Sequence, residues 1–140
     1  MYGALDLSKY IVAKCIEDGL PISNLQLQKI LYYIQKDFLK RDEMAFPDDI
    51  EAWQFGPVVP NVYYYYCGYG AMPISITKES FSILPSDAPY IDKVVEMKRI
   101  LNPWDMVAET HKEDGAWARI YRKGQGNHSV IPTGLIKEMG

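Results

Sequence analysis

Cysteine, long apolar runs and excess positive charge are all scarce in this sequence. Its 140 residues include two cysteines, Cys15 and Cys67, which are too few for a disulfide scaffold. We therefore expect two small buried side chains in a reducing compartment, the cytoplasm. No uncharged apolar run approaches the ~18 residues of a membrane span, and the N-terminus lacks the features of a signal peptide. Membrane insertion and export are not expected.

Lysine and arginine together number 15 against 18 aspartates and glutamates, which gives a net charge of -3. Domains that grip nucleic acid usually carry a basic excess, so nucleic acid is a disfavoured partner. Hydrophobic residues make up 48% of the chain, as in ordinary globular proteins. The chain shows no repeat or low-complexity linker, and we interpret residues 1–140 as a single domain.

Motifs that would identify a metal site or a catalytic nucleophile are also missing. Neither paired cysteines and histidines at ligand spacing, nor G-x-S-x-G, nor a phosphate loop occurs, so no metal, cofactor or catalytic residue is predicted. His111, with Glu113 and Asp114 nearby, leaves open a small hydrolase or transferase that also uses the 119–123 loop. A second alternative is a nucleic-acid-binding module built on the basic residues of that loop together with Lys36, Lys40 and Arg41.

Helical spacing of apolar residues dominates the chain. It predicts helices over Leu7–Ile16, from Ser23 to about Phe38, over Pro60–Cys67, from Asp87 to Asn102 and from Trp104 onward, with a last apolar patch at residues 131–136. Ser23 followed by Gln26 is typical of a capping box. The predicted fold is mainly α: a compact single-domain helical bundle of about five to six helices with a small two- or three-stranded β element.

The β element is predicted from two short segments. Residues 50–55 alternate apolar and polar side chains, and residues 72–76 are a candidate pairing partner for them. Gly56 and Pro57 should break the first strand and form the turn that directs the following helix. Trp53 and Trp117 are assigned to the core.

Four consecutive tyrosines occupy positions 63–66. On a helix, four successive side chains sweep about 300°, so one buried face cannot hide them all. Because tyrosine is common in protein interfaces, we predict a partner-binding surface, although a sandwiched core helix explains the run equally well. The candidate partner-binding residues are Tyr63, Tyr64, Tyr65, Tyr69 and Arg122.

Three stretches together resemble the Panacea domain, also called the SocA-like antitoxin family, which includes the GepA-type phage-associated proteins. They are SNLQLQKILYY from Ser23, EAWQFGPVVP from Glu51 with the tyrosines after it, and His111 with the Gly-Ala-Trp that ends at Trp117. The matching residues, expected to be structural, are Leu25, Gln28, Lys29, Tyr32, Glu51, Trp53, Gly56, Pro57, Val58, Tyr63, His111 and Trp117.

This resemblance implies an antitoxin that is not an enzyme and that neutralises a cognate toxin protein encoded nearby, in a toxin-antitoxin system or a prophage. It also implies adaptor function toward a Clp-type protease, as in the founding member. Some relatives carry an added helix-turn-helix domain that this chain lacks, so promoter binding is not expected. A homo-oligomer is left open.

Overall fold

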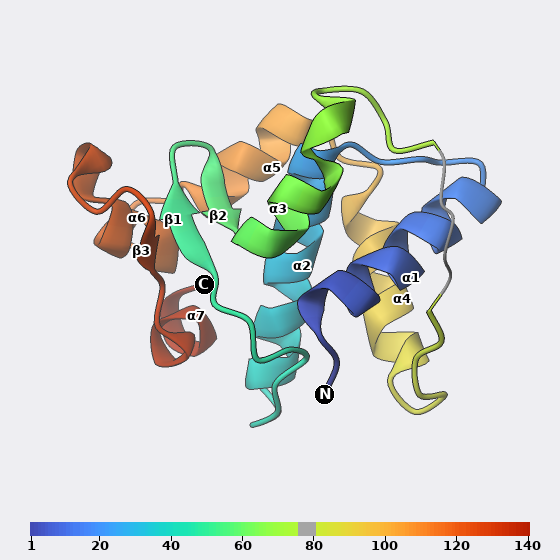
Figure 1. Ribbon diagram of the computed structural model, residues 1–140. Helices are drawn as coiled ribbons and strands as arrows, with labels where there is room; N and C mark the ends of the chain where they lie inside the picture. The colour runs from blue at the N-terminus through green and yellow to red at the C-terminus, as the bar shows by residue number, and fades with distance from the viewer. Residues whose placement is uncertain (76–80) are drawn as a thin grey trace.

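The computed structural model describes residues 1–75 and 81–140, which form one body around a central helix (Figure 1). Its α-helices are α1 (Ala4–Glu17), α2 (Asn24–Leu39), α3 (Pro60–Tyr66), α4 (Ala88–Lys98), α5 (Pro103–Thr110), α6 (Ala116–Tyr121) and α7 (Thr133–Met139). Short 3-10 turns, η1 (Cys67–Tyr69) and η2 (Arg122–Gly124), follow α3 and α6. The mainly helical fold with a small β element is confirmed, with seven helices in the described ranges.

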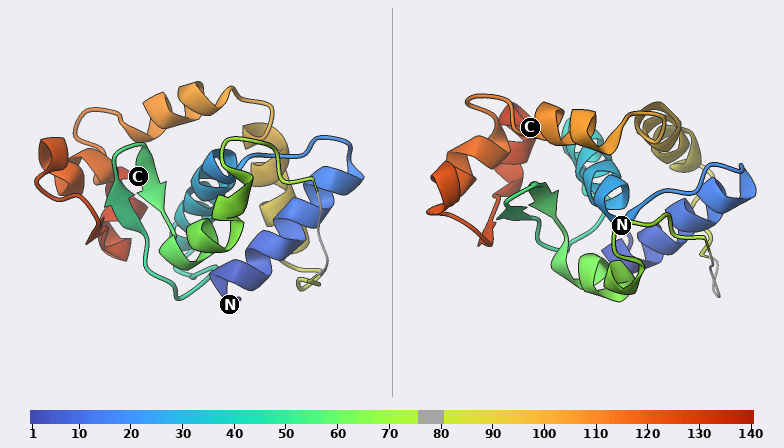
Figure 2. Two further views of the ribbon diagram at one scale, coloured as in Figure 1. Left: turned by 45° about the horizontal axis from the view of Figure 1, so that its top comes forward. Right: turned by 90° about the horizontal axis from the view of Figure 1, so that it is seen from above.

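Helix α2 lies at the centre and contacts α1, α3, α4, α5, α7 and strand β2 (Gly56–Val58) (Figure 2). It begins with the predicted capping box. The backbone N–H of Gln26 donates to the Ser23 hydroxyl at 3.3 Å, and the side-chain oxygen of Gln26 accepts from the Ser23 backbone N–H at 2.9 Å. Because neighbours surround α2, it buries polar side chains as well as its apolar stripe, including Asn24, Gln28 and Lys29.

The β element is a three-stranded antiparallel sheet in the order β2-β1-β3, formed by β1 (Glu51–Trp53), β2 and β3 (Ser129–Val130). The predicted pairing of β1 with residues 72–76 is wrong. Residues 72–75 form no strand, residue 76 lies outside the described residues, and the backbone of Ile74 instead bonds to Ile22. The third strand comes from near the C-terminus, where only two residues join the ladder.

Gly56 and Pro57 lie inside strand β2, so the turn expected there is wrong. The chain reverses one step earlier, at Gln54 and Phe55, and Trp53 pairs with Gly56. Gly56 has φ +118°, a backbone conformation that side chains with a Cβ rarely adopt. The hairpin therefore depends on glycine at this position, while Pro60 begins α3 as predicted.

Two burial expectations need correction. Cys15 is buried as expected, but Cys67 is exposed. Trp117 lies in the core, whereas Trp53 is half-buried at the surface of the hairpin. In the part of the chain that the structure describes, no helix has the length and apolar character needed to cross a membrane.

Candidate functional site

Buried polar side chains of α2 hold the hairpin and α3 in place. Asn24 donates to the Tyr63 carbonyl at 3.0 Å, and the Gln28 amide group donates to Asn24 at 2.9 Å. The Gln28 oxygen accepts from the Val59 backbone at 2.9 Å. These side chains lie one turn apart on α2, so a single helix face fixes where α3 begins and which way its tyrosines point.

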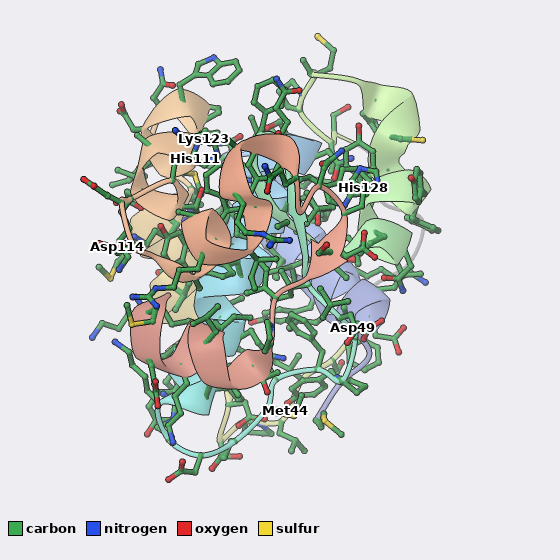
Figure 3. The ribbon with its side chains drawn as sticks, turned by 90° about the vertical axis from the view of Figure 1, so that its left-hand side faces the viewer. Met44, Asp49, His111, Asp114, Lys123 and His128 are labelled. Carbon is green, nitrogen blue, oxygen red and sulfur yellow. The ribbon has the colours of Figure 1, made fainter. Side chains whose placement is uncertain are left out.

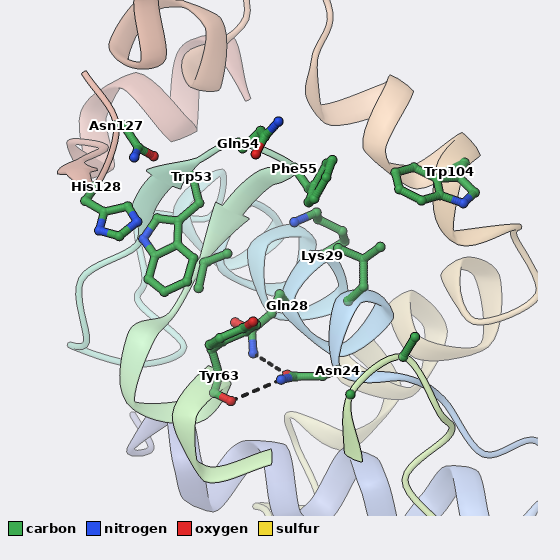
Figure 4. A pocket seen from close by; sticks show the side chains of 14 residues that line it. Asn24, Gln28, Lys29, Trp53, Gln54, Phe55, Tyr63, Trp104, Asn127 and His128 are labelled. Carbon is green, nitrogen blue, oxygen red and sulfur yellow. Dashed lines mark hydrogen bonds between the residues drawn. The ribbon is translucent and has the colours of Figure 1, made fainter. Parts of the chain in front are cut away.

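A hollow of about 510 Å³ opens between the hairpin, α2, α3 and α5, and we call it the aromatic pocket (Figure 4). Its aromatic walls are Trp53, Phe55, Tyr63, Trp104 and His128. Polar groups also line it, namely Asn24, Gln28, Lys29, Gln54 and Asn127. Among the described residues that line it, none is an aspartate or a glutamate. The pocket therefore combines apolar walls with hydrogen-bond donors and one lysine.

Contacts between rings connect the pocket to the outer surface. The ring centroids of Trp53 lie 4.3 Å from His128, 5.0 Å from Tyr63 and 6.0 Å from Tyr64. Phe55 and Trp104 form an edge-to-face pair 5.5 Å apart. Phe55 is 47% exposed, Trp104 60% and Tyr64 60%. Together Trp53, Phe55, Tyr63, Tyr64, Trp104 and His128 form what we call the aromatic face.

The tyrosine run divides between core and surface, as its helical geometry predicted. Tyr66 is buried, Tyr63 is half-buried in the pocket wall, and Tyr64 and Tyr65 are exposed. Tyr65 lies toward α1, where the Lys9 ammonium is 5.5 Å from its ring centroid.

The other two predicted partner-binding residues come from separate turns. Tyr69 is half-buried in η1, and Arg122 is exposed in η2. The segment that continues from η2 carries Asn127 and His128 into the pocket wall. Of the predicted set, the structure brings Tyr63 and Tyr64 into the aromatic face, and partner binding by all five residues stays a prediction.

Lys29 is buried within α2 with 0% of its surface exposed. Its ammonium donates to the Pro57 carbonyl at 3.1 Å, and desolvation lowers its pKa to about 7. A Cβ added to Gly56 would lie 2.9 Å from the Lys29 Cε and 2.8 Å from the Thr110 hydroxyl. The absent side chain of Gly56 is thus what leaves room for Lys29.

His111 forms the C-terminal cap of α5. Its ring stacks on Trp117 with centroids 3.6 Å apart and an interplanar angle of 4°, and Trp117 donates to the Trp53 carbonyl at 2.7 Å. Burial, and then the charge of Lys29, lowers the His111 pKa, so its ring is neutral at pH 7. Figure 3 shows His111 well separated from His128. This packing makes His111 a structural side chain in our interpretation and disfavours it as a catalytic base.

The basic residues of α2 gather with those of α4 at a second hollow, of about 360 Å³. Its basic lining residues are Lys36 of α2, Lys40 and Arg41 just after α2, and Lys93 and Lys98 of α4, and Asp37 is the one acidic residue among the described residues that line it. Arg41 pairs with Asp37 at 2.7 Å, and Lys98 pairs with Glu109 at 3.0 Å. Among the described residues, no group of three or more His, Cys, Asp or Glu side chains is placed to hold a metal ion.

Reasoning from the sequence missed Phe55 and Trp104 as parts of the site. Phe55 lies at the tip of the hairpin. The predicted strand included Phe55 and the predicted turn began at Gly56, so Phe55 was not recognised as a turn residue. Trp104 follows Pro103 in the first turn of α5, where Asn102 accepts from its backbone at 2.8 Å. A large aromatic side chain so close to a helix start is a usable signal, because first-turn side chains often lie outside the core.

Comparisons with known proteins identify the family of this chain. A family model described as "Antitoxin SocA-like, Panacea domain" matches residues 27–118, which include most of α2, the hairpin, α3 and α5. Antitoxin SocA of Caulobacter vibrioides (strain NA1000 / CB15N) is 33% identical over 124 residues, covering 79% of this chain and 66% of that protein. The chain thus spans just under two thirds of that relative's length. No solved structure matches. The chain belongs to the antitoxin SocA-like, Panacea domain family.

Proposed function

We propose that this chain binds and neutralises a protein toxin encoded beside it, and that the aromatic face is the contact surface. The observation that carries the proposal is the pocket rimmed by the exposed Phe55 and Trp104. Exposed aromatic side chains around a hollow are typical of the residues that dominate binding energy in protein interfaces. Tyr64 extends the same surface along α3 through its contact with Trp53.

Family membership supports a role in toxin neutralisation, and the packing of His111 supports a function without catalysis. Neutralisation requires a rigid surface that holds the toxin. Here α2 supplies that rigidity, because Asn24 and Gln28 fix the backbone of α3. The proposed toxin-binding residues are Phe55, Tyr63, Tyr64 and Trp104, with Tyr65, Tyr69 and Arg122 as candidates at the edges of the surface.

Alanine substitutions at Phe55 and Trp104 test this surface. Because both side chains are largely exposed, we expect Phe55→Ala and Trp104→Ala to fold normally and to weaken toxin binding by about 30-fold each, which corresponds to ~2 kcal/mol. Binding is measured by copurification and titration with the product of the adjacent gene, and neutralisation by growth during co-expression. Ile100→Ala, at a position 72% exposed and outside the pocket lining, is the matched control. Full rescue of growth by both variants would contradict the proposal.

Delivery of the toxin to a Clp-type protease would be a further activity of the same complex. An adaptor shortens the half-life of its toxin, whereas a simple inhibitor lengthens it or leaves it unchanged. Following toxin half-life with and without this chain, in cells with and without the protease, therefore separates the two mechanisms.

A second candidate function is nucleic-acid binding at the basic hollow of α2 and α4. The observation that favours it is the gathering of Lys36, Lys40 and Lys93 with two further cations around one acidic residue. Binding through phosphates weakens steeply with salt, so a labelled duplex or single strand should shift at low salt and lose the shift as salt increases. No shift at low salt excludes this function, as the net charge of -3 leads us to expect.

A further inference from the structure

Lys29 carries a buried ammonium group that forms no ion pair with any acidic residue in the described ranges 1–75 and 81–140. Among the described residues, one group accepts a hydrogen bond from it, the carbonyl of Pro57, although an ammonium has three N–H donors. Within the described residues, none of the ion pairs includes Lys29. Burying an ammonium without a countercharge costs free energy, so the charged Lys29 destabilises the free protein.

The groups that face Lys29 supply no negative charge. Helix α5 contributes Thr110 and His111, whose Nε2 atom is itself buried without a hydrogen-bond partner in the described chain. Strand β2 contributes the backbone of Gly56 and Pro57. Across the aromatic pocket, the titratable side chains are Tyr63 from α3 and His128 from the segment after η2. Among these described groups, the Lys29 ammonium is therefore the one that would attract an anion, and no carboxylate competes for it.

Lys29 also lines the aromatic pocket, and Figure 4 shows its amine end directed toward the hairpin beside Phe55. None of the acidic residues that the structure describes lines this pocket. Side-chain amides of Gln54 and Asn127 lie at its edge and can donate hydrogen bonds. The pocket thus matches an occupant that has an apolar portion and a negatively charged group.

We propose that the aromatic pocket receives a carboxylate of the bound toxin, carried beside an apolar side chain, and that the Lys29 ammonium, which solvent does not reach in the free protein, turns toward the pocket on binding and becomes its countercharge. This inference rests on the proposed function and specifies the chemistry of the partner at the same surface. A protein segment fits better than a free small acid, because Phe55 and Trp104 extend outward from the pocket and a small ligand would leave them uncovered. A carboxylate beside Lys29 would supply the countercharge that its ammonium lacks, and it would keep Lys29 protonated in the complex.

Binding should then take up a proton at alkaline pH, because the free protein loses the Lys29 proton near neutrality. For the wild type, we expect affinity for the adjacent gene's product to fall by up to about tenfold per pH unit between pH 7 and 9. Lys29→Met should bind about 30-fold more weakly at pH 6.5, with little remaining dependence on pH. Lys36→Met, on the same helix but outside the pocket lining, should retain wild-type behaviour.

Changing each Asp and Glu of the toxin in turn to its amide identifies the carboxylate without altering this chain. One such variant should lose affinity about 30-fold in the wild-type complex and almost none when combined with Lys29→Met, which is the signature of a direct pair. Tight binding that is unchanged by Lys29→Met and by every amide variant would overturn the carboxylate pair and leave the proposed function standing.

A probe that needs no toxin separates failure of this inference from failure of the proposed function. Titration with 3-phenylpropionate and with 3-phenylpropionamide, followed by the NMR signals of the tryptophan indoles, compares an apolar acid with its neutral analogue. We expect the acid to bind at least about tenfold more tightly, and only when Lys29 is present. Equal binding of acid and amide overturns the role of Lys29. If this protein binds the acid selectively but does not bind the product of the adjacent gene, the proposal of a toxin partner is overturned and the role of Lys29 stands.

Discussion

Replacing Gly56 with alanine should destabilise the protein by about 3 kcal/mol. Gly56 has φ +118°, and strain of this kind alone costs about 1–3 kcal/mol. The added Cβ would also lie 2.8 Å from the Thr110 hydroxyl and 2.9 Å from the Lys29 Cε, and both of these side chains are buried. Urea unfolding followed by circular dichroism measures the loss.

Gly134→Ala is the matched control for that substitution. Gly134 lies in α7, has no positive φ, and a Cβ built there meets no atom within 4 Å. Alanine favours the helix, so this variant should be as stable as the wild type or up to about 1 kcal/mol more stable. A wild-type midpoint for Gly56→Ala would show that Lys29 and the hairpin tolerate an additional side chain, and the packing described here would be wrong.

Local sequence signals predicted the helices well because helical periodicity and capping involve neighbouring residues. Ser23 and Gln26 form the expected box, and Pro60 begins α3 as expected. The sheet required information that is distant in the sequence. Strand β3 has two residues and pairs with β1 from about eighty positions away, so neither its length nor its alternation distinguished it. The 72–76 segment resembled a strand more closely than β3 did.

The candidate site was predictable only in part for a similar reason. The tyrosine run predicted exposed aromatic side chains on its own, since the geometry of one helix turn required it. Lys29 was identified by the family resemblance as structural, but its complete burial follows from neighbours that surround α2 on all sides. A lysine flanked at helical spacing by apolar residues is normally solvent-exposed, and only the packing of β2 and α5 against it shows otherwise.

Replacing Lys29 with methionine should stabilise the protein at pH 6, by about 2 kcal/mol. Methionine fills a similar volume without a charge, while the wild type must bury an ammonium whose hydrogen-bond acceptor, in the part of the chain that the structure describes, is the single carbonyl of Pro57. The pKa of Lys29 is lowered to about 7 in the folded chain, against an ordinary value near 10.5. Below pH 7 both folded and unfolded chains hold the proton, and the penalty for burying the charge is complete.

Between pH 7 and 10.5 the unfolded chain keeps this proton and the folded chain releases it, so the contribution of Lys29 to stability rises with pH by roughly 1.4 kcal/mol per unit. The advantage of Lys29→Met should therefore shrink above pH 7 and vanish or reverse near pH 9, where the neutral amine still bonds to Pro57. Comparing the urea unfolding of the two proteins at each pH cancels the other titrating groups. Lys36→Met should show a smaller dependence on pH. Burial also lowers the pKa of Lys36, but this side chain is only partly buried, so water still solvates its ammonium. A difference between wild type and Lys29→Met that stays constant from pH 6 to 9 would mean that Lys29 does not titrate there, and the proton uptake expected on toxin binding would lose its source.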